Sequence, residues 1–62
     1  MEKWIADAVG KMHVYKIKQS DLAKKLDYTT EYVNMVLNGK RTPAGAETTF
    51  VAALNELIAE RS

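Results

Sequence analysis

The stretch from Gln19 to Asn38 constrains the fold most, because it contains two short helical patterns with almost nothing between them. The first pattern places apolar side chains at i, i+1 and i+4, and the second at i, i+3 and i+4. These side chains are Leu22, Ala23 and Leu26, then Val33, Val36 and Leu37. So short a joint does not let two helices run antiparallel over much length. The spacing therefore predicts two helices crossing at a steep angle, a helix-turn-helix over about 19–38.

The residues around the joint favour such a crossing. Ala23 is small enough to let two crossing helices touch, and Asp27 lies where a positive φ is needed, which Asp tolerates at modest cost. Tyr28 can place its ring in the angle between the helices. Thr29 is a good N-cap for the second helix, and Glu31 adds a negative charge that the dipole of that helix favours.

These residues resemble the helix-turn-helix of small phage repressors, the Cro and repressor class within the XRE-like family. The resemblance is carried by Gln19, Leu22-Ala23, Leu26, Val33, Val36 and the closing run Leu37-Asn38-Gly39-Lys40. It implies an all-α, compact, lambda-repressor-like DNA-binding domain of four or five helices, with residues 1–62 as one domain around the central motif. Two residues depart from the family pattern. Asp27 replaces the usual Gly, and Lys18 replaces a capping Thr, so that cap either comes from Ser20 or is missing.

The flanking segments predict two further helices, over about 2–14 and 46–60. The first has an apolar stripe of Trp4, Ile5, Ala8, Val9 and Met12. The second has a broad stripe of Phe50, Val51, Leu54, Leu57 and Ile58, widened by Ala46, Ala53 and Ala52. Part of that broad stripe is a candidate dimer surface. We also expect Ile17 to enter the core and Gly39 to end the second motif helix; Pro43 either lies in the following loop or opens the last helix.

The net charge of +1 is small for a nucleic-acid-binding protein, but its distribution is uneven. The segment from Lys11 to Arg41 holds seven Lys or Arg against three Asp or Glu, a net +4. The remainder holds two against five, a net −3. Such a dipolar chain would be oriented by a polyanion. The alternative for each isolated lysine is a solvated side chain with no partner.

Several functional classes have no support in the sequence. The chain has no cysteine, which excludes disulfides and thiolate metal sites and fits a reducing cytoplasm. The resemblance implies that this is the cytoplasm of a bacterium or a phage-infected host cell. No apolar run approaches membrane-spanning length. His13 has no second ligand at metal-binding spacing, and no catalytic or cofactor motif is present. We therefore expect no enzyme activity, cofactor or metal. The initial Met and the helical end favour a complete gene product over a fragment.

The resemblance assigns roles to ten polar or exposed residues. The residues it implies for reading base edges are Gln19, Thr30, Glu31, Asn34 and Met35. The candidates for contacting phosphates lie at both ends of the motif, where the two DNA strands would pass. They are Lys16, Lys18, Asn38, Lys40 and Arg41. Because the second motif helix carries no arginine, the commonest bidentate contact to guanine is absent from it. The alternative is an ordinary polar helix surface.

The leading interpretation is a transcriptional regulator of the phage repressor or Cro type. It would place its second motif helix in the major groove of a double-stranded operator, as a homodimer at least on DNA. The second interpretation is a protein-interaction module, such as an antirepressor that binds another regulator. Low net charge, Glu31 and the missing arginine favour this alternative.

Overall fold

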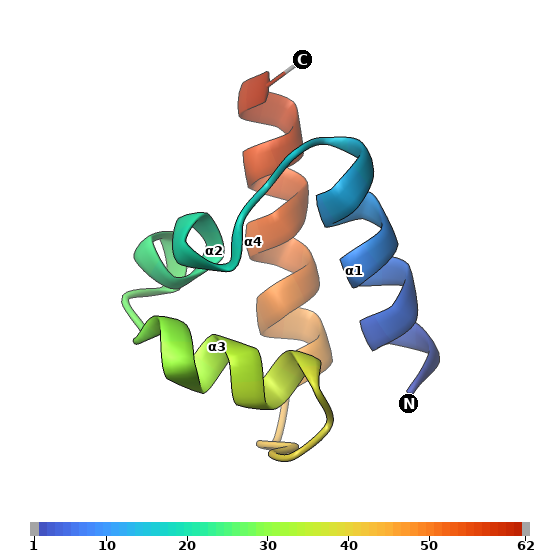
Figure 1. Ribbon diagram of the computed structural model, residues 1–62, viewed down its shortest axis with the longest axis vertical. Coiled ribbons are helices and arrows are strands. Elements are labelled where there is room, and N and C mark those ends of the chain that lie inside the picture. The colour runs from blue at the N-terminus through green and yellow to red at the C-terminus, as the bar shows by residue number, and fades with distance from the viewer. Residues whose placement is uncertain (1, 62) are drawn as a thin grey trace.

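The computed structural model describes residues 2–61, which form four helices and no strand (Figure 1). They are α1 (Lys3–Val14), α2 (Gln19–Leu26), α3 (Thr30–Leu37) and α4 (Ala46–Arg61). The predicted outer bounds, about 2–14 and 46–60 for the flanking helices and 19–38 for the motif, agree with these to within one residue. The all-α prediction is confirmed for this part of the chain. Pro43 lies in the loop before α4 rather than at its first position. None of the helices is both long and apolar enough to cross a membrane.

The longest helix, α4, is the one against which two of the other three helices pack. Both α1 and α2 pack against it, and α3 packs against α2. Figure 1 shows α1 running beside α4, with α2 and α3 on the other side of the molecule. The two short helices therefore lie away from α1, and one side of each remains open to solvent.

The core contains only apolar side chains, because no polar or charged side chain among the described residues is buried. Phe50 of α4 is buried, and the Trp4 ring meets it edge-on at 6.1 Å between ring centroids. The remaining buried side chains are Ile5, Ala8, Met12, Ile17, Leu22, Ala23, Val33, Val36, Leu37, Ala46, Ala53, Leu54 and Leu57. These confirm most of the predicted stripes and the burial of Ile17.

The stripe predictions were too wide at some positions. Val9 was expected in the core but is 42% exposed, because it lies toward the outer side of α1. Ala52 is also exposed, so it does not widen the buried face of α4. Val51 and Ile58 are half-buried at the margins of that face. Periodicity located the centre of each buried face correctly but not its edges.

The first three helices end in the same way, each with one residue in the left-handed conformation. These residues are Lys16 (φ 58°), Asp27 (φ 59°) and Gly39 (φ 76°). In each case the next residue donates its N–H to the carbonyl five residues earlier. The bonds are Ile17 to Met12 at 2.8 Å, Tyr28 to Ala23 at 2.9 Å, and Lys40 to Met35 at 2.9 Å. This pairing satisfies carbonyls that a helix end leaves free. The positive φ predicted for Asp27 is confirmed, and so is the helix stop at Gly39.

Two ion pairs join the end of α4 to α2. Lys25 Nζ lies 2.7 Å from Glu60 Oε2, and Arg61 Nη2 lies 3.0 Å from Asp21 Oδ2. The hydrogen bond to Glu60 raises the pKa of Lys25 above its ordinary value. These pairs are exposed, so their role is to orient the end of α4 rather than to supply much of the stability.

Replacing Asp27 by Gly should stabilise the protein, because Gly adopts φ 59° without the steric cost that a Cβ incurs. We expect Asp27→Gly to raise the free energy of unfolding by about 0.5–1 kcal/mol in urea titrations followed by circular dichroism. Asp27→Val is the matched control and should be destabilised, since a β-branched residue is an outlier at positive φ. A less stable Gly variant would mean that the Asp27 side chain itself stabilises the turn.

Candidate nucleic-acid interface

The three-residue turn between α2 and α3 is held at both ends. The left-handed Asp27 ends α2, and Thr29 caps α3 by accepting the Tyr32 N–H on Oγ1 at 3.1 Å. The Tyr28 ring lies edge-on to Tyr32 at 5.1 Å and 6.1 Å from Phe50, measured between ring centroids. The Tyr28 ring thus packs against α3 and α4 at the turn but stays 42% exposed, so it fills the angle between the two motif helices only in part.

The buried face of α3 determines which of its residues meet solvent. Val33, Val36 and Leu37 are buried against the core. The exposed edge of α3 therefore consists of Thr30, Glu31, Asn34 and Asn38. Met35 was expected on that exposed edge but is half-buried, and Gln19 at the start of α2 is half-buried as well.

Three amide side chains form a hydrogen-bonded chain across α2 and α3, which we call the amide ladder. Asn34 Nδ2 donates to Gln19 Oε1 at 3.2 Å. Asn38 Nδ2 donates to Asn34 Oδ1 at 3.0 Å and to the Asn34 backbone carbonyl at 2.9 Å. Sequence reasoning placed all three residues on this surface but did not find the ladder. The Asn38 amide nitrogen is already engaged here, so its predicted phosphate contact would compete with Asn34.

The start of α2 is capped through Asp21 rather than through Ser20. The Asp21 carboxylate accepts the Lys18 N–H at 3.0 Å, while Lys18 itself has no acceptor in its side chain. Only this half of a capping box is formed, because α2 has no side-chain bond from its N-cap residue. The Ser20 alternative is therefore wrong. A cap from the side chain of the N-cap residue itself is missing, as the other alternative has it, and Asp21 bonds the backbone at this helix start instead. Asp21 already accepts the Lys18 N–H at this helix start and its charge is paired with Arg61, so a phosphate would have to compete for that N–H.

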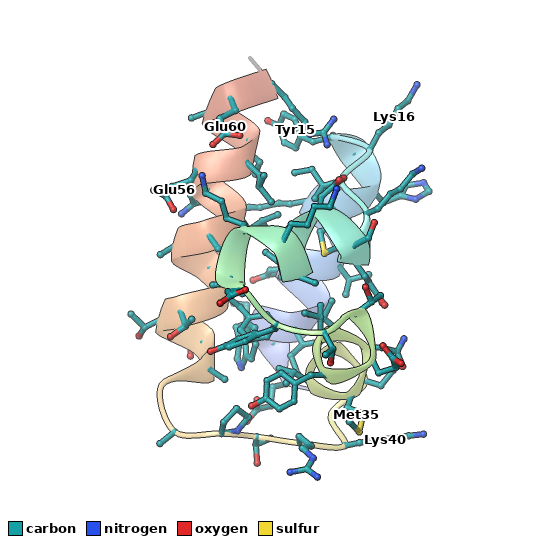
Figure 2. All side chains as sticks on the ribbon, turned by 90° about the vertical axis from the view of Figure 1, so that its left-hand side faces the viewer. Tyr15, Lys16, Met35, Lys40, Glu56 and Glu60 are labelled. Atoms are coloured by element: carbon teal, nitrogen blue, oxygen red, sulfur yellow. The ribbon has the colours of Figure 1, made fainter. Side chains whose placement is uncertain are left out.

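Two of the predicted phosphate-contacting cations, Lys16 and Lys40, project from one side of the molecule (Figure 2). Lys16, Lys18, Lys40 and Arg41 are all exposed. In Figure 2 the labelled Lys16 and Lys40 lie on the side away from α4, with Met35 close to Lys40. Glu56 and Glu60 lie on the opposite side, along α4 (Figure 2). These two lysines and these two glutamates therefore lie on opposite sides of the molecule (Figure 2).

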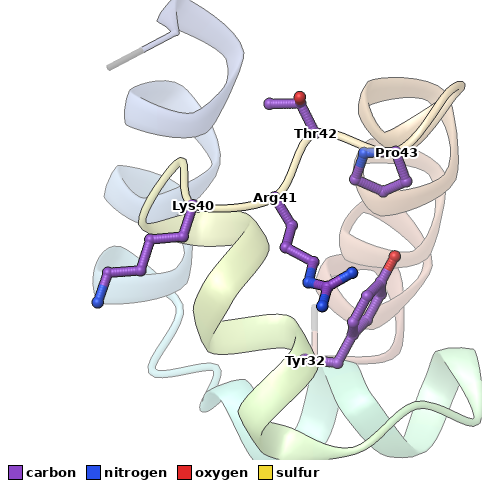
Figure 3. Close-up of a pocket in the computed structure, with 5 residues that line it drawn as sticks. All are labelled: Tyr32, Lys40, Arg41, Thr42 and Pro43. Carbon is purple, nitrogen blue, oxygen red and sulfur yellow. The ribbon is translucent and has the colours of Figure 1, made fainter.

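A shallow pocket lies between the first turn of α3 and the loop before α4. It is lined by Tyr32 and by the run from Lys40 to Pro43. Figure 3 shows the Arg41 side chain pointing toward the Tyr32 ring, while Lys40 points away from the pocket. The two neighbouring cations therefore serve different sides of α3. Sequence reasoning grouped them together and did not place Tyr32 beside Arg41.

Among residues 2–61 there is no group of three or more His, Asp or Glu side chains that could hold a metal ion. His13 is exposed on α1. What the surface presents is a polar helix edge with exposed cations at its two ends. The chain matches no protein-family model, no curated protein and no solved structure.

Proposed function

We propose that this protein is a sequence-specific regulator that binds double-stranded DNA, of the phage repressor or Cro type, with a lambda-repressor-like arrangement. The observation that carries the proposal is the exposed polar edge of α3, with Lys16 and Lys40 projecting on the same side. A single α-helix fits the major groove, and residues near its start reach base edges first. Thr30 and Glu31 occupy that position on α3.

The base-reading chemistry of α3 is mixed. Thr30 can donate, accept or contact a thymine methyl, and Glu31 can accept from cytosine N4. Met35 contributes apolar contact from its exposed part. Since α3 carries no arginine, part of the selectivity must come from Gln19 and from DNA shape.

The affinity of one such domain would be modest, because only four exposed cations flank the motif. Two copies reading half-sites about 34 Å apart would supply both affinity and selectivity. We therefore propose a homodimer on DNA. The half-buried Val51 and Ile58 on α4 are its candidate contact residues.

A protein partner is the second candidate. Val14 is 72% exposed at the end of α1, with Val9 and Tyr15 each more than 40% exposed nearby in the chain. Val14 and Tyr15 are adjacent in the chain, and an exposed apolar patch at the end of α1 would favour contact with a protein over contact with phosphate. This candidate corresponds to a regulator that binds another regulator instead of DNA.

A mobility-shift assay on unrelated duplex DNA at low salt separates the two candidates. Binding in the range of non-specific DNA affinities, on the order of tens of micromolar or tighter, is expected for the DNA regulator. If no shift occurs at that concentration, the DNA proposal fails. Selection of bound sites from random duplexes then gives the operator, and a palindromic result would support the dimer.

Lys40 and Arg41 should act on the DNA backbone, so removing either charge should weaken binding to all sequences alike. With four cations at phosphates, the slope of log K against log salt should be about −3 to −4. Lys40→Ala or Arg41→Ala should flatten it by about 0.9. The control is Lys3→Ala, which removes the same charge from the start of α1. An effect confined to one DNA sequence would contradict the assignment to phosphates.

Thr30 and Glu31 should instead control which bases are preferred. Thr30→Ala or Glu31→Ala should change the consensus obtained by site selection, because each removes a group that reaches base edges. We expect discrimination at one base pair to fall by about 1–3 kcal/mol. If both variants return the unchanged consensus, α3 is not the reading helix.

A further inference from the structure

The amide ladder has a defined direction, because one of its acceptors is a backbone carbonyl. The Asn34 carbonyl can only accept, so the group of Asn38 lying 2.9 Å from it must be the NH₂ group. The same NH₂ group lies 3.0 Å from the Asn34 side chain, which must therefore present its oxygen. This leaves Asn34 Nδ2 on the other side, where it donates to Gln19 Oε1 at 3.2 Å. The orientation of all three amides follows from a single backbone atom.

This direction limits what Gln19 can offer to another molecule. Its Oε1 is held toward α3 by Asn34. Its Nε2 carries two N–H donors and donates to no other group within residues 2–61. A freely rotating glutamine could offer one donor and one acceptor side by side, the pattern that matches adenine N7 and N6. In the ladder, the Gln19 oxygen faces Asn34, so the two N–H donors on Nε2 are the groups that remain for another molecule.

We propose that Asn34 is a positioning residue that orients Gln19 to read guanine rather than adenine. Guanine presents two acceptors in the major groove, N7 and O6, which match the two N–H donors of Gln19 Nε2. Each polar atom of the Asn34 side chain already makes one bond within the ladder, so we assign Asn34 the positioning of Gln19 rather than a base contact of its own. The inference rests on the proposed DNA-binding function. It supplies a guanine contact that the arginine-free α3 lacks.

Asn34→Asp is the test that should invert the preference. A carboxylate only accepts, so Asp at this position would take an N–H from Gln19 and turn Gln19 Oε1 outward. Asn38 could still donate to the carboxylate, so the remainder of the ladder would be kept. The outward acceptor would then match the amino groups of adenine N6 or cytosine N4. Asn34→Ala should leave Gln19 free and remove most of the preference.

The measurement is competition binding among duplexes that differ at one base pair. Gln19→Ala first identifies the position whose preference depends on Gln19. There the unmodified protein should favour guanine over adenine by about fivefold or more. Asn34→Asp should reverse this ratio, and Asn34→Ala should bring it close to one. Asn55→Asp on the exposed surface of α4 is the control for added negative charge, and it should lower affinity without changing the ratio. An adenine preference in the unmodified protein, or an unchanged ratio in Asn34→Asp, would overturn the proposal.

A second measurement, without DNA, tests the ladder separately from the proposed function. In side-chain amide NMR, the Asn34 amide protons should exchange with water more slowly than those of Gln19. In Asn34→Asp the Gln19 amide protons should become the slower ones. Faster exchange at Asn34 than at Gln19 in the unmodified protein would refute the ladder. Slow exchange at Asn34 with no DNA binding would instead refute the proposed function and leave the ladder itself standing.

Discussion

The left-handed conformation of Asp27 is the constraint on which the surface of α3 depends. With φ 59° and ψ 41°, it turns the chain out of α2, and the Tyr28 N–H closes the end of that helix on the Ala23 carbonyl. The turn then places Thr29 where its Oγ1 can cap α3. Burial of Val33, Val36 and Leu37 follows from that direction, and the polar edge of α3 is what remains outside. One backbone conformation thus links a three-residue joint to the composition of an exposed face.

Helix ends were predictable where the terminating residue has a conformational preference of its own. Gly39 and Asp27 belong to the residue types that tolerate positive φ, and both were found from the sequence. Lys16 has no such preference, yet it adopts φ 58°. Its conformation is imposed from outside, because it lets the next residue, Ile17, enter the core and bond the Met12 carbonyl. The left-handed conformation of Lys16 was not predicted, because it depends on the packing of Ile17 and not on a preference of lysine itself.

The sequence predicted which side of each helix in the candidate site is exposed, but it did not predict the hydrogen bonds between side chains there. Periodicity alone identified which residues of α3 point outward, apart from the half-buried Met35. It could not show that Asn34 bonds Gln19, 15 residues earlier, or that Arg61 bonds Asp21, 40 residues earlier. Such pairs depend on how the helices are placed against one another. The bond from the Lys18 N–H to Asp21 was not predicted either, because residue preference alone points to Ser20, a residue type favoured at N-caps.

Charge also acts through placement rather than through its total. Lys25 and Arg61 are paired with acidic partners between α2 and α4, whereas Lys16 and Lys40 project on the side away from Glu56 and Glu60. Salt at about 0.1 M screens exposed charges beyond roughly 10 Å, so the acidic side would subtract little from the attraction of the cations nearest a bound polyanion. The few cations would nevertheless give weak sequence-independent binding. Under the proposed function, discrimination must then come from contacts whose geometry is already set before binding. An amide whose donors are oriented by its neighbours meets that requirement better than a longer, freely rotating cation would.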